Sequence, residues 1–317
     1  MNILHLSDTP LSGAPLRLSN LLFDHGGVHS RHVVWSHKSV QWGKDFPFDI
    51  LASEMKDQPE RLRWLIFEWA DVLHFHNRWR RQEIFKLIGE EPPKKPSVIQ
   101  IHSPRLSENF SDEVGSGIPL AIVAQYHPRQ WPELRYIVPN VVDINDRVHK
   151  RDMPELYNLP PTVSYAPSNT HGKGWDDKGF FKTAKILDKM QNSGRIVRDF
   201  IIHSSFADTM TRKRMADIGI DEVITGSYHL STLEYLSLGI PCFANTDEKT
   251  EKVVKDLTGC RTLPFLKADL NTLENAITKI ARKRSWQDLG MEARTWMETY
   301  WNPQVLCSHY LKMYNSL

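Results

Sequence analysis

The sequence predicts an α/β protein made of two Rossmann-like, doubly wound domains. Its 317 residues suffice for two domains of ordinary size, each with its own core. Short apolar runs alternate with segments of helical spacing in both halves of the chain, which is typical of βαβ units and parallel sheets. A polar stretch over residues 145–161, closed by Pro160 and Pro161, separates the two alternations and predicts the domain boundary.

In the first half, five apolar runs are expected to form strands, at residues 2–7, 32–37, 72–76, 97–102 and 120–125. Helical spacing between them predicts helices over residues 15–24, 59–69 and 81–89. Parallel strands require such crossovers, because a tight turn cannot return the chain to the same end of the sheet. A further short strand begins at Tyr136 and ends in the turn chemistry of Pro139 and Asn140.

The second alternation begins after the proline pair. Strands are expected at residues 162–166, 199–203, 222–225 and 241–245. Helices are expected at residues 179–191, 207–218 and 232–238, and the chain is mostly helical from Leu273 onward, with a break at Asn302 and Pro303. We therefore expect domains at residues 1–145 and 146–300, followed by a C-terminal helix at residues 301–317.

Composition and charge exclude several classes of protein. The formal net charge is +2, from 40 basic and 38 acidic residues, which argues against nucleic acid as a bulk electrostatic partner. Basic clusters at residues 78–81 and 212–214 are interpreted as solvated helix faces. Three cysteines without metal-ligand spacing fit a reducing, cytoplasmic compartment.

Nothing in the sequence predicts a membrane span or a secretory leader. No stretch approaches the ~20 apolar residues that a spanning helix requires. The first residues run straight into an apolar strand without a basic leader. If the protein works at a membrane, we expect it to be peripheral.

Residues 226–241 carry the most informative pattern, a small polar loop that follows a strand and opens a helix containing Glu234. Backbone N–H groups at a helix start, with the positive end of the helix dipole, form a site for a diphosphate. A carboxylate one turn into the helix can accept hydrogen bonds from a pair of ribose hydroxyls. The alternative is that Ser231 and Glu234 form a capping box, in which both satisfy N–H groups at the helix start.

A second pattern lies at residues 164–179, where a strand runs into a Gly-rich polar loop with two lysines, Lys173 and Lys178, before a helix. A lysine supplies a compact positive charge that can neutralise a leaving diphosphate. The alternative is a flexible surface loop whose lysines are exposed.

The first half offers weaker candidates. Gly13 follows the first strand, where a glycine lets the backbone approach a phosphate closely, although an ordinary βα turn is favoured when this segment is taken by itself. His102 closes a strand, either as a residue beside a substrate or as a hydrogen-bonded structural histidine. His74 and His76 face the same side of one strand, but no third ligand is evident, so we expect core or cleft histidines and no metal site.

Together these segments resemble the retaining GT-B glycosyltransferases of family 4 (glycosyl transferases group 1). The family has a Gly-containing loop before a Glu-Ala-Met-Ala-x-Gly-x-Pro-like helix, as at residues 226–241, and a Lys-Gly before a helix, as at Lys178 and Gly179. Its Val-Pro-Asn-Gly-Val-Asp segment is similar to residues 138–143, and its Thr-x-His element to the strand end at His102. The resemblance covers most of the chain and is strongest over residues 138–245. It implies two Rossmann-like domains that face each other across a cleft, with residues 1–145 on the acceptor side and residues 146–300 binding the nucleotide sugar. The C-terminal helix at residues 301–317 would cross back to the first domain.

The resemblance also implies roles for individual residues. Glu234 would bind the donor ribose, Lys173 would contact the diphosphate, and His102 and Lys178 would be catalytic, with His102 beside the transferred sugar. The residues that would bind the donor are Gly13, Lys173, Lys178, Ser227, Tyr228, His229, Leu230 and Glu234.

The activity implied is transfer of a sugar, with retention and without a metal ion or other cofactor, from a nucleotide diphosphate donor. We expect a UDP-sugar, and the acceptor stays open among a glycan, a lipid, a small molecule, a protein and modified DNA. The family's sugar-contacting glutamate, eight residues before Glu234, is replaced here by Gly226, with Asp221 and Glu222 just upstream. The alternative function is therefore a non-catalytic GT-B protein that binds a nucleotide sugar or a partner glycosyltransferase.

Other functions are disfavoured by motifs that the sequence lacks. No Gly-x-x-x-x-Gly-Lys-Ser/Thr phosphate loop of NTPases occurs, and no Gly-x-Gly-x-x-Gly of dinucleotide oxidoreductases follows the first strand. No convincing Asp-x-Asp metal site marks the other glycosyltransferase fold. A sugar nucleotide epimerase of the same architecture is disfavoured by the Lys-Gly and Pro-Asn elements.

Overall fold

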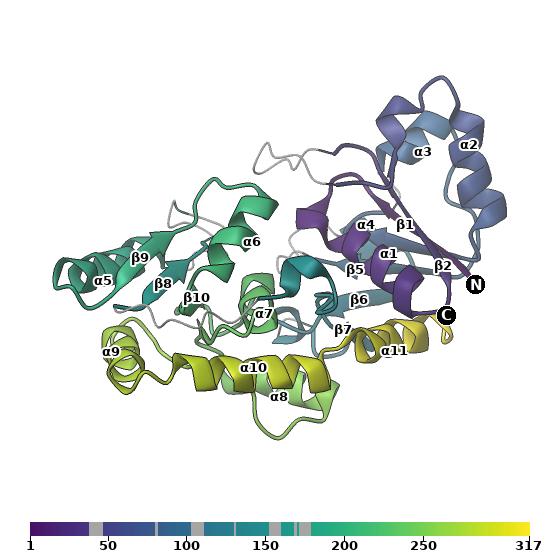
Figure 1. Ribbon diagram of the computed structural model, residues 1–317. Coiled ribbons are helices and arrows are strands. Elements are labelled where there is room, and N and C mark those ends of the chain that lie inside the picture. The colour runs from purple at the N-terminus through teal and green to yellow at the C-terminus, as the bar shows by residue number, and fades with distance from the viewer. Residues whose placement is uncertain are drawn as a thin grey trace. The chain divides into compact units, whose positions relative to one another are not determined.

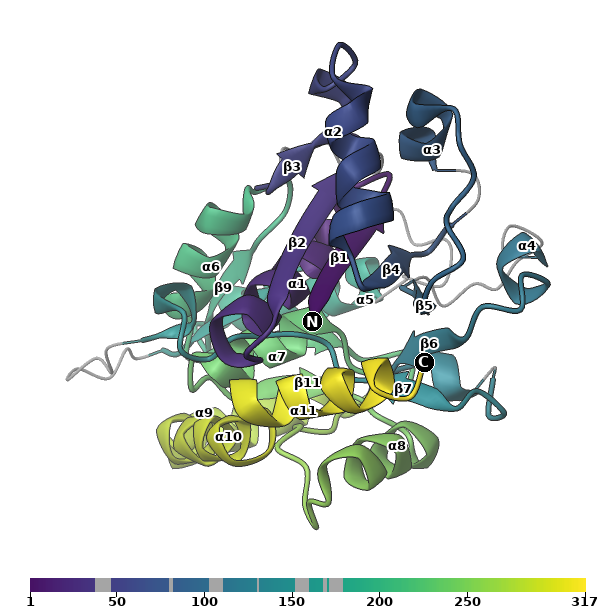
Figure 2. The same cartoon turned by 90° about the vertical axis from the view of Figure 1, so that its right-hand side faces the viewer.

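The computed structural model describes residues 1–37, 47–79, 82–102, 111–129, 131–151, 160–167, 170 and 179–317. The chain forms two compact units, of which unit 1 comprises Met1–Val141 with Pro303–Leu317 and unit 2 comprises Val142–Asn302. Each unit is built on its own parallel sheet (Figures 1 and 2). The prediction of an α/β chain with two doubly wound halves is thus confirmed. The assignment of residues 1–145 to the acceptor and 146–300 to the donor stays a prediction.

Unit 1 contains a seven-stranded sheet in the order β3-β2-β1-β4-β5-β6-β7, with every pair parallel. Its strands are β1 (Asn2–Ser7), β2 (His29–Val34), β3 (Ile50–Leu51), β4 (Val72–His76), β5 (Ser97–Ile101), β6 (Leu120–Val123) and β7 (Tyr136–Val138). The order reverses between β1 and β4. In open α/β sheets ligands bind beyond the carboxyl ends of the strands at such a switch point.

The helices of unit 1 lie on both faces of this sheet. They are α1 (Ala14–His25), α2 (Pro59–Trp64) with a π-helical turn (Leu65–Trp69), α3 (Glu83–Ile88), α4 (Ser111–Val114) and α11 (Pro303–Tyr314). On one face, strand residues such as Leu6, Phe75 and Ile99 form an apolar core with Leu62 of α2 and Ile84 of α3. The C-terminal α11 packs beside α1 (Figure 1), where Cys307 Sγ contacts the carbonyl oxygen of Leu21.

The other face of the same sheet carries histidines. Successive side chains of a strand point to opposite faces, so the residues between the apolar ones share the second face. The parallel register places His5 of β1 level with His32 of β2 and His74 of β4. All three are buried, as is His76 two residues further along β4.

Unit 2 contains a four-stranded parallel sheet in the order β11-β10-β8-β9. Its elements are β8 (Thr162–Tyr165), α5 (Phe180–Asn192), β9 (Val197–Phe200), α6 (Phe206–Arg214), β10 (Ile218–Glu222), α7 (Leu230–Ser237), β11 (Cys242–Ala244), α8 (Glu248–Thr258), α9 (Leu273–Lys283) and α10 (Trp286–Tyr300). The chain leaves β8 to one side for β9 and returns to the other side for β10. The switch point of this sheet therefore lies between β8 and β10, whose following loops are the two predicted donor loops.

Two neighbouring elements of unit 2 differ from the sequence prediction. The helix predicted over residues 207–218 ends at Arg214, and the strand predicted at residues 222–225 is β10, Ile218–Glu222. The error arises from Asp221 and Glu222. Because acidic residues are depleted in strands, this pair was not expected inside a strand, and the strand was predicted to begin here instead of ending here. In the structure both are fully buried at the carboxyl end of β10.

Gly219 in β10 explains how this short strand fits under α7. A Cβ atom at this position would lie 2.6 Å from Cγ of the Tyr235 ring. The Tyr235 side chain is fully buried, and its hydroxyl lies 2.6 Å from Ser164 Oγ on β8. The absence of a side chain at Gly219 therefore lets α7 pack closely on the sheet and fixes the position of the loop before it.

Among the described helices, none combines the length and the apolar character needed to cross a bilayer.

Candidate active site

The loop between β10 and α7 is held by two carboxylates of its own strand. Glu222 Oε2 accepts hydrogen bonds from the N–H groups of Ile224 and Thr225, at 3.1 and 2.5 Å, and Oε1 accepts one from Ser227 at 3.3 Å. Gly226, within this turn, has φ +73°, a left-handed conformation that glycine adopts without strain. The Glu222 carboxylate thus accepts the hydrogen bonds that these N–H groups could otherwise donate to a bound anion.

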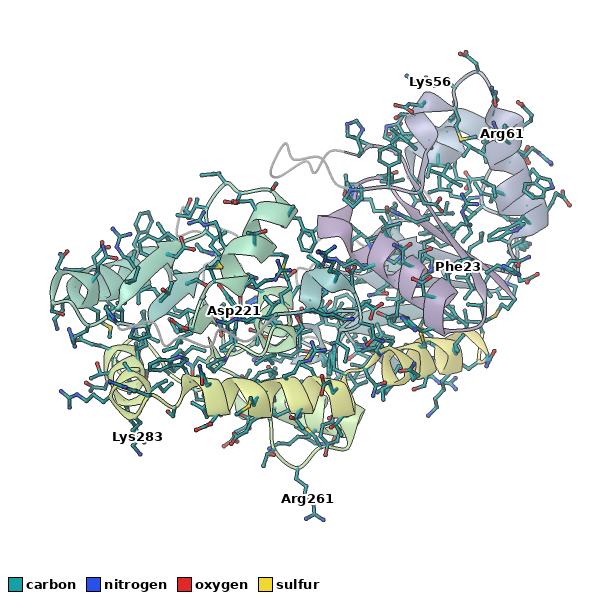
Figure 3. All side chains as sticks on the ribbon, in the orientation of Figure 1. Phe23, Lys56, Arg61, Asp221, Arg261 and Lys283 are labelled. Carbon is teal, nitrogen blue, oxygen red and sulfur yellow. The ribbon has the colours of Figure 1, made fainter. Side chains whose placement is uncertain are left out.

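Asp221 holds the other end of the loop, at the start of α7 (Figure 3). Its Oδ2 accepts hydrogen bonds from the N–H of His229 and from Thr232 Oγ1, both at 2.7 Å, and lies 3.2 Å from His229 Nδ1. The loop conformation is therefore set by the protein itself before any ligand binds. The N–H groups of Ser227 and His229, expected against a diphosphate, already donate to these two carboxylates.

The other two loop residues differ in exposure. Tyr228 is fully buried and stacks on Phe265 with ring centroids 5.1 Å apart, so only its backbone can face a ligand. Leu230 is half-buried and is the first residue of α7.

Glu234 lies in the second turn of α7 and pairs with a buried cation. Lys213 of α6 donates from Nζ to Glu234 Oε2 at 2.6 Å and to Ser231 Oγ at 2.8 Å. The same Nζ lies 4.5 Å from the centre of the Tyr235 ring. The Lys213 side chain is 1% exposed and that of Glu234 is 8% exposed, so the carboxylate is held as a charged, oriented group.

This pair corrects two sequence interpretations. The capping box of Ser231 and Glu234 is wrong, because the N-cap of α7 is His229 and Ser231 Oγ instead accepts from Lys213. The interpretation of residues 212–214 as a solvated helix face is wrong for Lys213, whose aliphatic stem and ammonium are buried.

Of the second predicted donor loop, the structure describes only residues 164–167, 170 and 179. Lys173 and Lys178 lie outside the described residues, and their roles stay predictions. Gly179, which follows Lys178, is the N-cap of α5 with φ +72°, and a Cβ there would lie 2.5 Å from Ile224 Cδ1. Gly179, at the start of α5, is therefore pressed against Ile224 of the β10–α7 loop.

In unit 1, the loop after β1 is strained. Leu11, Ser12 and Gly13 have φ values of +46°, +56° and +79° in succession. A non-glycine residue in this region costs of order 1–3 kcal/mol, and such strain concentrates at functional sites. Gly13 is the N-cap of α1, so the predicted site residue lies at a helix start as expected.

An open pocket of about 380 Å³ lies beside this loop, at the switch point between β1 and β4. Its lining residues are Asp8, Thr9, Leu11, His76, Asn77, Arg78, Glu83 and Lys86. Asp8 Oδ1 accepts a hydrogen bond from the N–H of Glu83 at 3.0 Å. Burial raises the pKa of Asp8 from its ordinary 3.8 to about 6, against the smaller lowering effect of that hydrogen bond.

His102 follows β5 directly, half-buried at the carboxyl edge of the sheet. Its backbone N–H donates to Asn77 Oδ1 at 2.7 Å, and Asn77 itself has φ +67° and donates its N–H to the carbonyl of Gln100 at 2.8 Å. Its Nε2 lies 2.8 Å from His76 Nδ1. Burial, with a smaller contribution from His127, lowers the pKa of His102 from its ordinary 6.5 to about 3.

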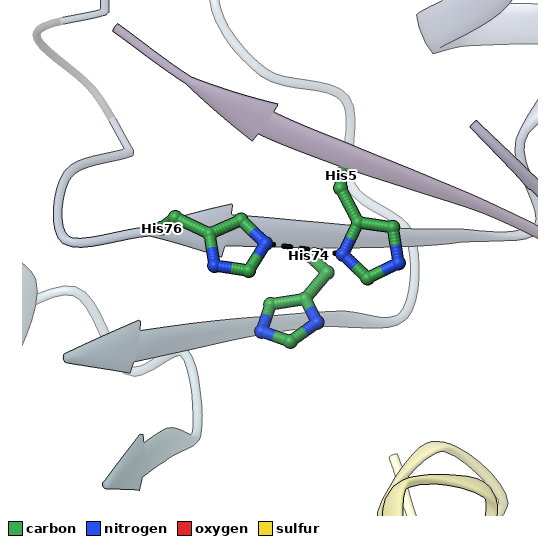
Figure 4. Close-up of side chains that lie close together, drawn as sticks. All are labelled: His5, His74 and His76. Carbon is green, nitrogen blue, oxygen red and sulfur yellow. Dashed lines mark hydrogen bonds between the residues drawn. The ribbon is translucent and has the colours of Figure 1, made fainter. Parts of the chain in front are cut away.

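The histidine face contains the group of three that the sequence did not reveal. His5, His74 and His76 (Figure 4) each offer a ring nitrogen within 4.8 Å of the other two, so His5 is the third candidate ligand missing from the sequence analysis. The rings of His74 and His76, however, stack at 4.3 Å with an interplanar angle of 19°. Lone pairs in nearly parallel planes do not converge on one ion, which tetrahedral zinc at ~2.0–2.1 Å requires.

Instead, the buried imidazoles bond to one another and to Tyr314. His5 Nδ1 lies 3.0 Å from His76 Nε2, and His74 Nδ1 lies 2.7 Å from the hydroxyl oxygen of Tyr314. Burial, followed by the neighbouring histidines, lowers the pKa of His5, His74 and His76 well below the ordinary 6.5. These side chains are therefore neutral at neutral pH.

Sequence reasoning missed Lys213, His5 and Asn77. His5 had a detectable signal, because adjacency of the first and third predicted strands would place it beside His74. The pairing of Lys213 with Glu234 depends on the packing of α6 against α7, and the left-handed Asn77 depends on tertiary structure, so neither leaves a local pattern.

Comparison with known proteins identifies the fold. No protein-family model matches the sequence, and a search of curated proteins finds no match either. Solved structures do match over essentially the whole chain. Sucrose-phosphate synthase from Thermosynechococcus elongatus has 12% identity and a TM-score of 0.57, covering 100% of this chain and 99% of its own.

Two further structures agree. HepE of Anabaena, solved in complex with UDP, has 13% identity and a TM-score of 0.57, covering 100% of both chains. A glycosyltransferase from Rickettsia africae has 12% identity and a TM-score of 0.58, covering 99% of this chain and 98% of its own. These neighbours are GT-B glycosyltransferases. The chain described here therefore has the two-domain α/β architecture of the GT-B fold.

Proposed function

We propose that this protein is a GT-B glycosyltransferase that moves a sugar from a nucleotide diphosphate donor, UDP-sugar being the first candidate, to an acceptor not yet identified. Retention of anomeric configuration and independence of divalent metal belong to the same proposal. The proposal rests on the fold together with one local observation: the buried Glu234 in the second turn of α7, which Lys213 orients beside the switch point of unit 2.

The physical support for a nucleotide at this position is specific. A carboxylate paired with a buried ammonium stays charged, and a charged acceptor strengthens hydrogen bonds to ribose hydroxyls. The loop that precedes it is held by Asp221 and Glu222, so a donor would meet a formed surface and would not have to order one. The UDP complex of HepE, a protein of the same fold, makes UDP the first nucleotide to test.

In the proposed reaction the chain's own groups stabilise the leaving diphosphate. Lys173 and Lys178, with backbone N–H groups at helix starts, would offset the negative charge that grows as the sugar–phosphate bond breaks. His102 and Gly13 would lie on the acceptor side. Tyr228 and Leu230 would contribute through the backbone, since the Tyr228 side chain is buried, whereas the N–H groups of Ser227 and His229 already donate to Glu222 and Asp221.

A non-catalytic, nucleotide-binding role is the second candidate, and one observation favours it. Gly226 stands where the resembling family has its sugar-contacting glutamate, and the nearest carboxylates, Asp221 and Glu222, are already bonded to the loop. Such a protein would bind a nucleotide sugar, or a partner glycosyltransferase, without turning the donor over.

One pair of measurements separates the two candidates. Screening nucleoside diphosphates and their sugars by thermal shift finds the donor, since a ligand bound to the native state raises the melting temperature. UDP release from the best ligand then measures transfer or hydrolysis. A melting shift with UDP release supports the enzyme, and a shift without release supports the nucleotide-binding protein. No shift with any nucleotide rejects both of these and leaves only the binding of a partner glycosyltransferase.

A further inference from the structure

Three histidines on adjoining strands of unit 1 form an unbroken hydrogen-bonded chain. His5 Nδ1 of β1 lies 3.0 Å from His76 Nε2 of β4, and His76 Nδ1 lies 2.8 Å from His102 Nε2 at the end of β5. His5 and His76 are buried, whereas His102 is half-buried. The chain thus leads from the interior of the sheet to the carboxyl edge where ligands bind in this architecture.

The hydrogen bonds in this histidine chain must all point the same way. A neutral imidazole carries one N–H donor and one bare acceptor nitrogen. His76 is bonded through both of its nitrogens, so it donates from one and accepts at the other. Either every proton points from His5 toward His102, or every proton points from His102 toward His5.

The inner end of the chain selects between the two directions. His5 Nε2 is buried and has no hydrogen-bond partner among the described residues. If protons point inward, this nitrogen carries an N–H that is buried and unbonded. If they point outward, it carries only a bare lone pair. A buried, unbonded N–H is the rarer and costlier defect, so the outward direction is favoured.

We propose that His76, supported by His5, is a positioning residue that holds His102 in the tautomer protonated at Nδ1. In this arrangement His5 Nδ1–H donates to His76 Nε2, and His76 Nδ1–H donates to His102 Nε2. The imidazole of His74 stays outside the chain, since its Nδ1 bonds to Tyr314. Asn77, which follows His76 at the end of β4, accepts a hydrogen bond from the backbone N–H of His102 and so fixes its position.

The consequence concerns what His102 can do. Its Nε2 is occupied, so the group that it can present to a substrate is the Nδ1–H. His102 would then act as a hydrogen-bond donor to a sugar hydroxyl or phosphate oxygen, and not as a base. This consequence rests on the proposed function, whereas the tautomer itself does not.

The tautomer can be measured directly in the full-length protein without any substrate. Long-range proton–nitrogen correlation spectra of protein labelled with ¹⁵N-histidine distinguish protonated from bare ring nitrogens. We expect His102 protonated at Nδ1 and bare at Nε2, and His76 protonated at Nδ1. A proton on His102 Nε2 would overturn the proposal.

Two variants of His76 test the cause. His76→Asn keeps a donor near the position of Nδ1, and His76→Phe removes both ring nitrogens while filling the space. We expect His102 to keep its tautomer in the first and to gain Nε2–H population in the second. His32→Phe is the matched control, because His32 is equally buried on the same face but bonds to Ser7, outside the chain.

Turnover provides the second readout. With a donor in hand, His76→Phe should lower kcat about tenfold or more, while His76→Asn and His32→Phe stay near the parent rate. Equal losses in His76→Phe and His32→Phe would show a merely structural role and overturn the proposal. If the parent protein releases no UDP, the proposed function fails, and the spectra still decide the tautomer.

Discussion

Nζ of Lys213 and Oε2 of Glu234 lie 2.6 Å apart, and both side chains are almost completely buried. A buried ion pair contributes little net stability, but removal of one partner leaves an uncompensated charge. The pair therefore couples the proposed ribose ligand to the packing of α6 against α7.

The first prediction follows from this coupling. Glu234→Gln should weaken donor binding by about one to two powers of ten, because charge-assisted hydrogen bonds are worth roughly 1.5–3 kcal/mol. It should also lower the free energy of unfolding by about 3–5 kcal/mol, since Lys213 loses its partner. Calorimetric titration with the donor and urea unfolding measure the two effects.

The double variant Lys213→Met with Glu234→Gln separates stability from binding. It removes the buried charge, so stability should largely return while donor affinity stays low. Normal donor affinity in both variants would show that Glu234 only supports the fold.

The second prediction concerns Gly219 and Tyr235. Gly219→Ala should destabilise unit 2 by about 1–3 kcal/mol, the usual cost of overpacking a core, because the new Cβ meets the Tyr235 ring at 2.6 Å. Combining it with Tyr235→Leu should recover part of the loss relative to the sum of the two single changes. If the double variant loses as much unfolding free energy as the two single variants together, the contact between Gly219 and the Tyr235 ring is contradicted.

The sequence predicted the regular parts of the fold well. β1 and β4 have the predicted bounds, because each is a short run of apolar residues and histidine that is followed by polar residues. The predicted position of β10 was wrong because Asp221 and Glu222 are buried inside the protein. Their hydrogen-bond partners lie in a loop that forms only in the folded chain. β3, with two residues, is too short to leave a periodic signal.

The candidate site was predictable only in its outline. The position of Glu234 in the helix after the loop follows from local spacing, and the structure agrees with it. The burial of Lys213, the histidine chain and the left-handed Asn77 arise from contacts between elements far apart in sequence. Periodicity carries no information about such contacts, so they could not be found before the sheet order was known.

The third prediction is a pH dependence at Asp8. Its folded pKa of about 6 lies above the unfolded value near 3.8, so the native state binds the extra proton between these values. Its contribution to stability is fully present below about pH 4 and is lost as the pH rises through 6. Relative to the parent, Asp8→Asn should therefore gain about 1–3 kcal/mol between pH 4 and pH 7.

Unfolding free energies of the two proteins across this range test the effect. Asp24→Asn, a change at an exposed carboxylate of the same unit, controls for the loss of a negative charge. A pH-independent difference between the parent and Asp8→Asn would contradict the shift.

The fourth prediction is that turnover needs no divalent ion. The proposal assigns charge neutralisation at the diphosphate to lysines and helix starts, which chelators leave intact. Exhaustive EDTA treatment should leave the rate of UDP release within about twofold of the untreated rate. Loss of a catalytic metal would lower the rate far more, because such a metal stabilises the transition state by several kcal/mol. Activity abolished by EDTA and restored by Mg²⁺ or Mn²⁺ would reject this part of the proposal.

The last prediction tests catalysis against binding at Lys173 and Lys178. Negative charge builds on the diphosphate only as the sugar bond breaks, so a lysine aimed there stabilises the transition state more than the bound donor. Replacement by alanine should then lower kcat, with a smaller rise in KM for the donor. Lys178 should show the larger effect, because it precedes Gly179, which packs against Ile224 of the β10–α7 loop.

Lys182, on α5 one turn further along, provides a matched control whose alanine variant should keep the parent rate. A binding protein would instead lose nucleotide affinity in the lysine variants with no turnover to lose. Parent rates in both Lys173→Ala and Lys178→Ala would show that the diphosphate lies elsewhere.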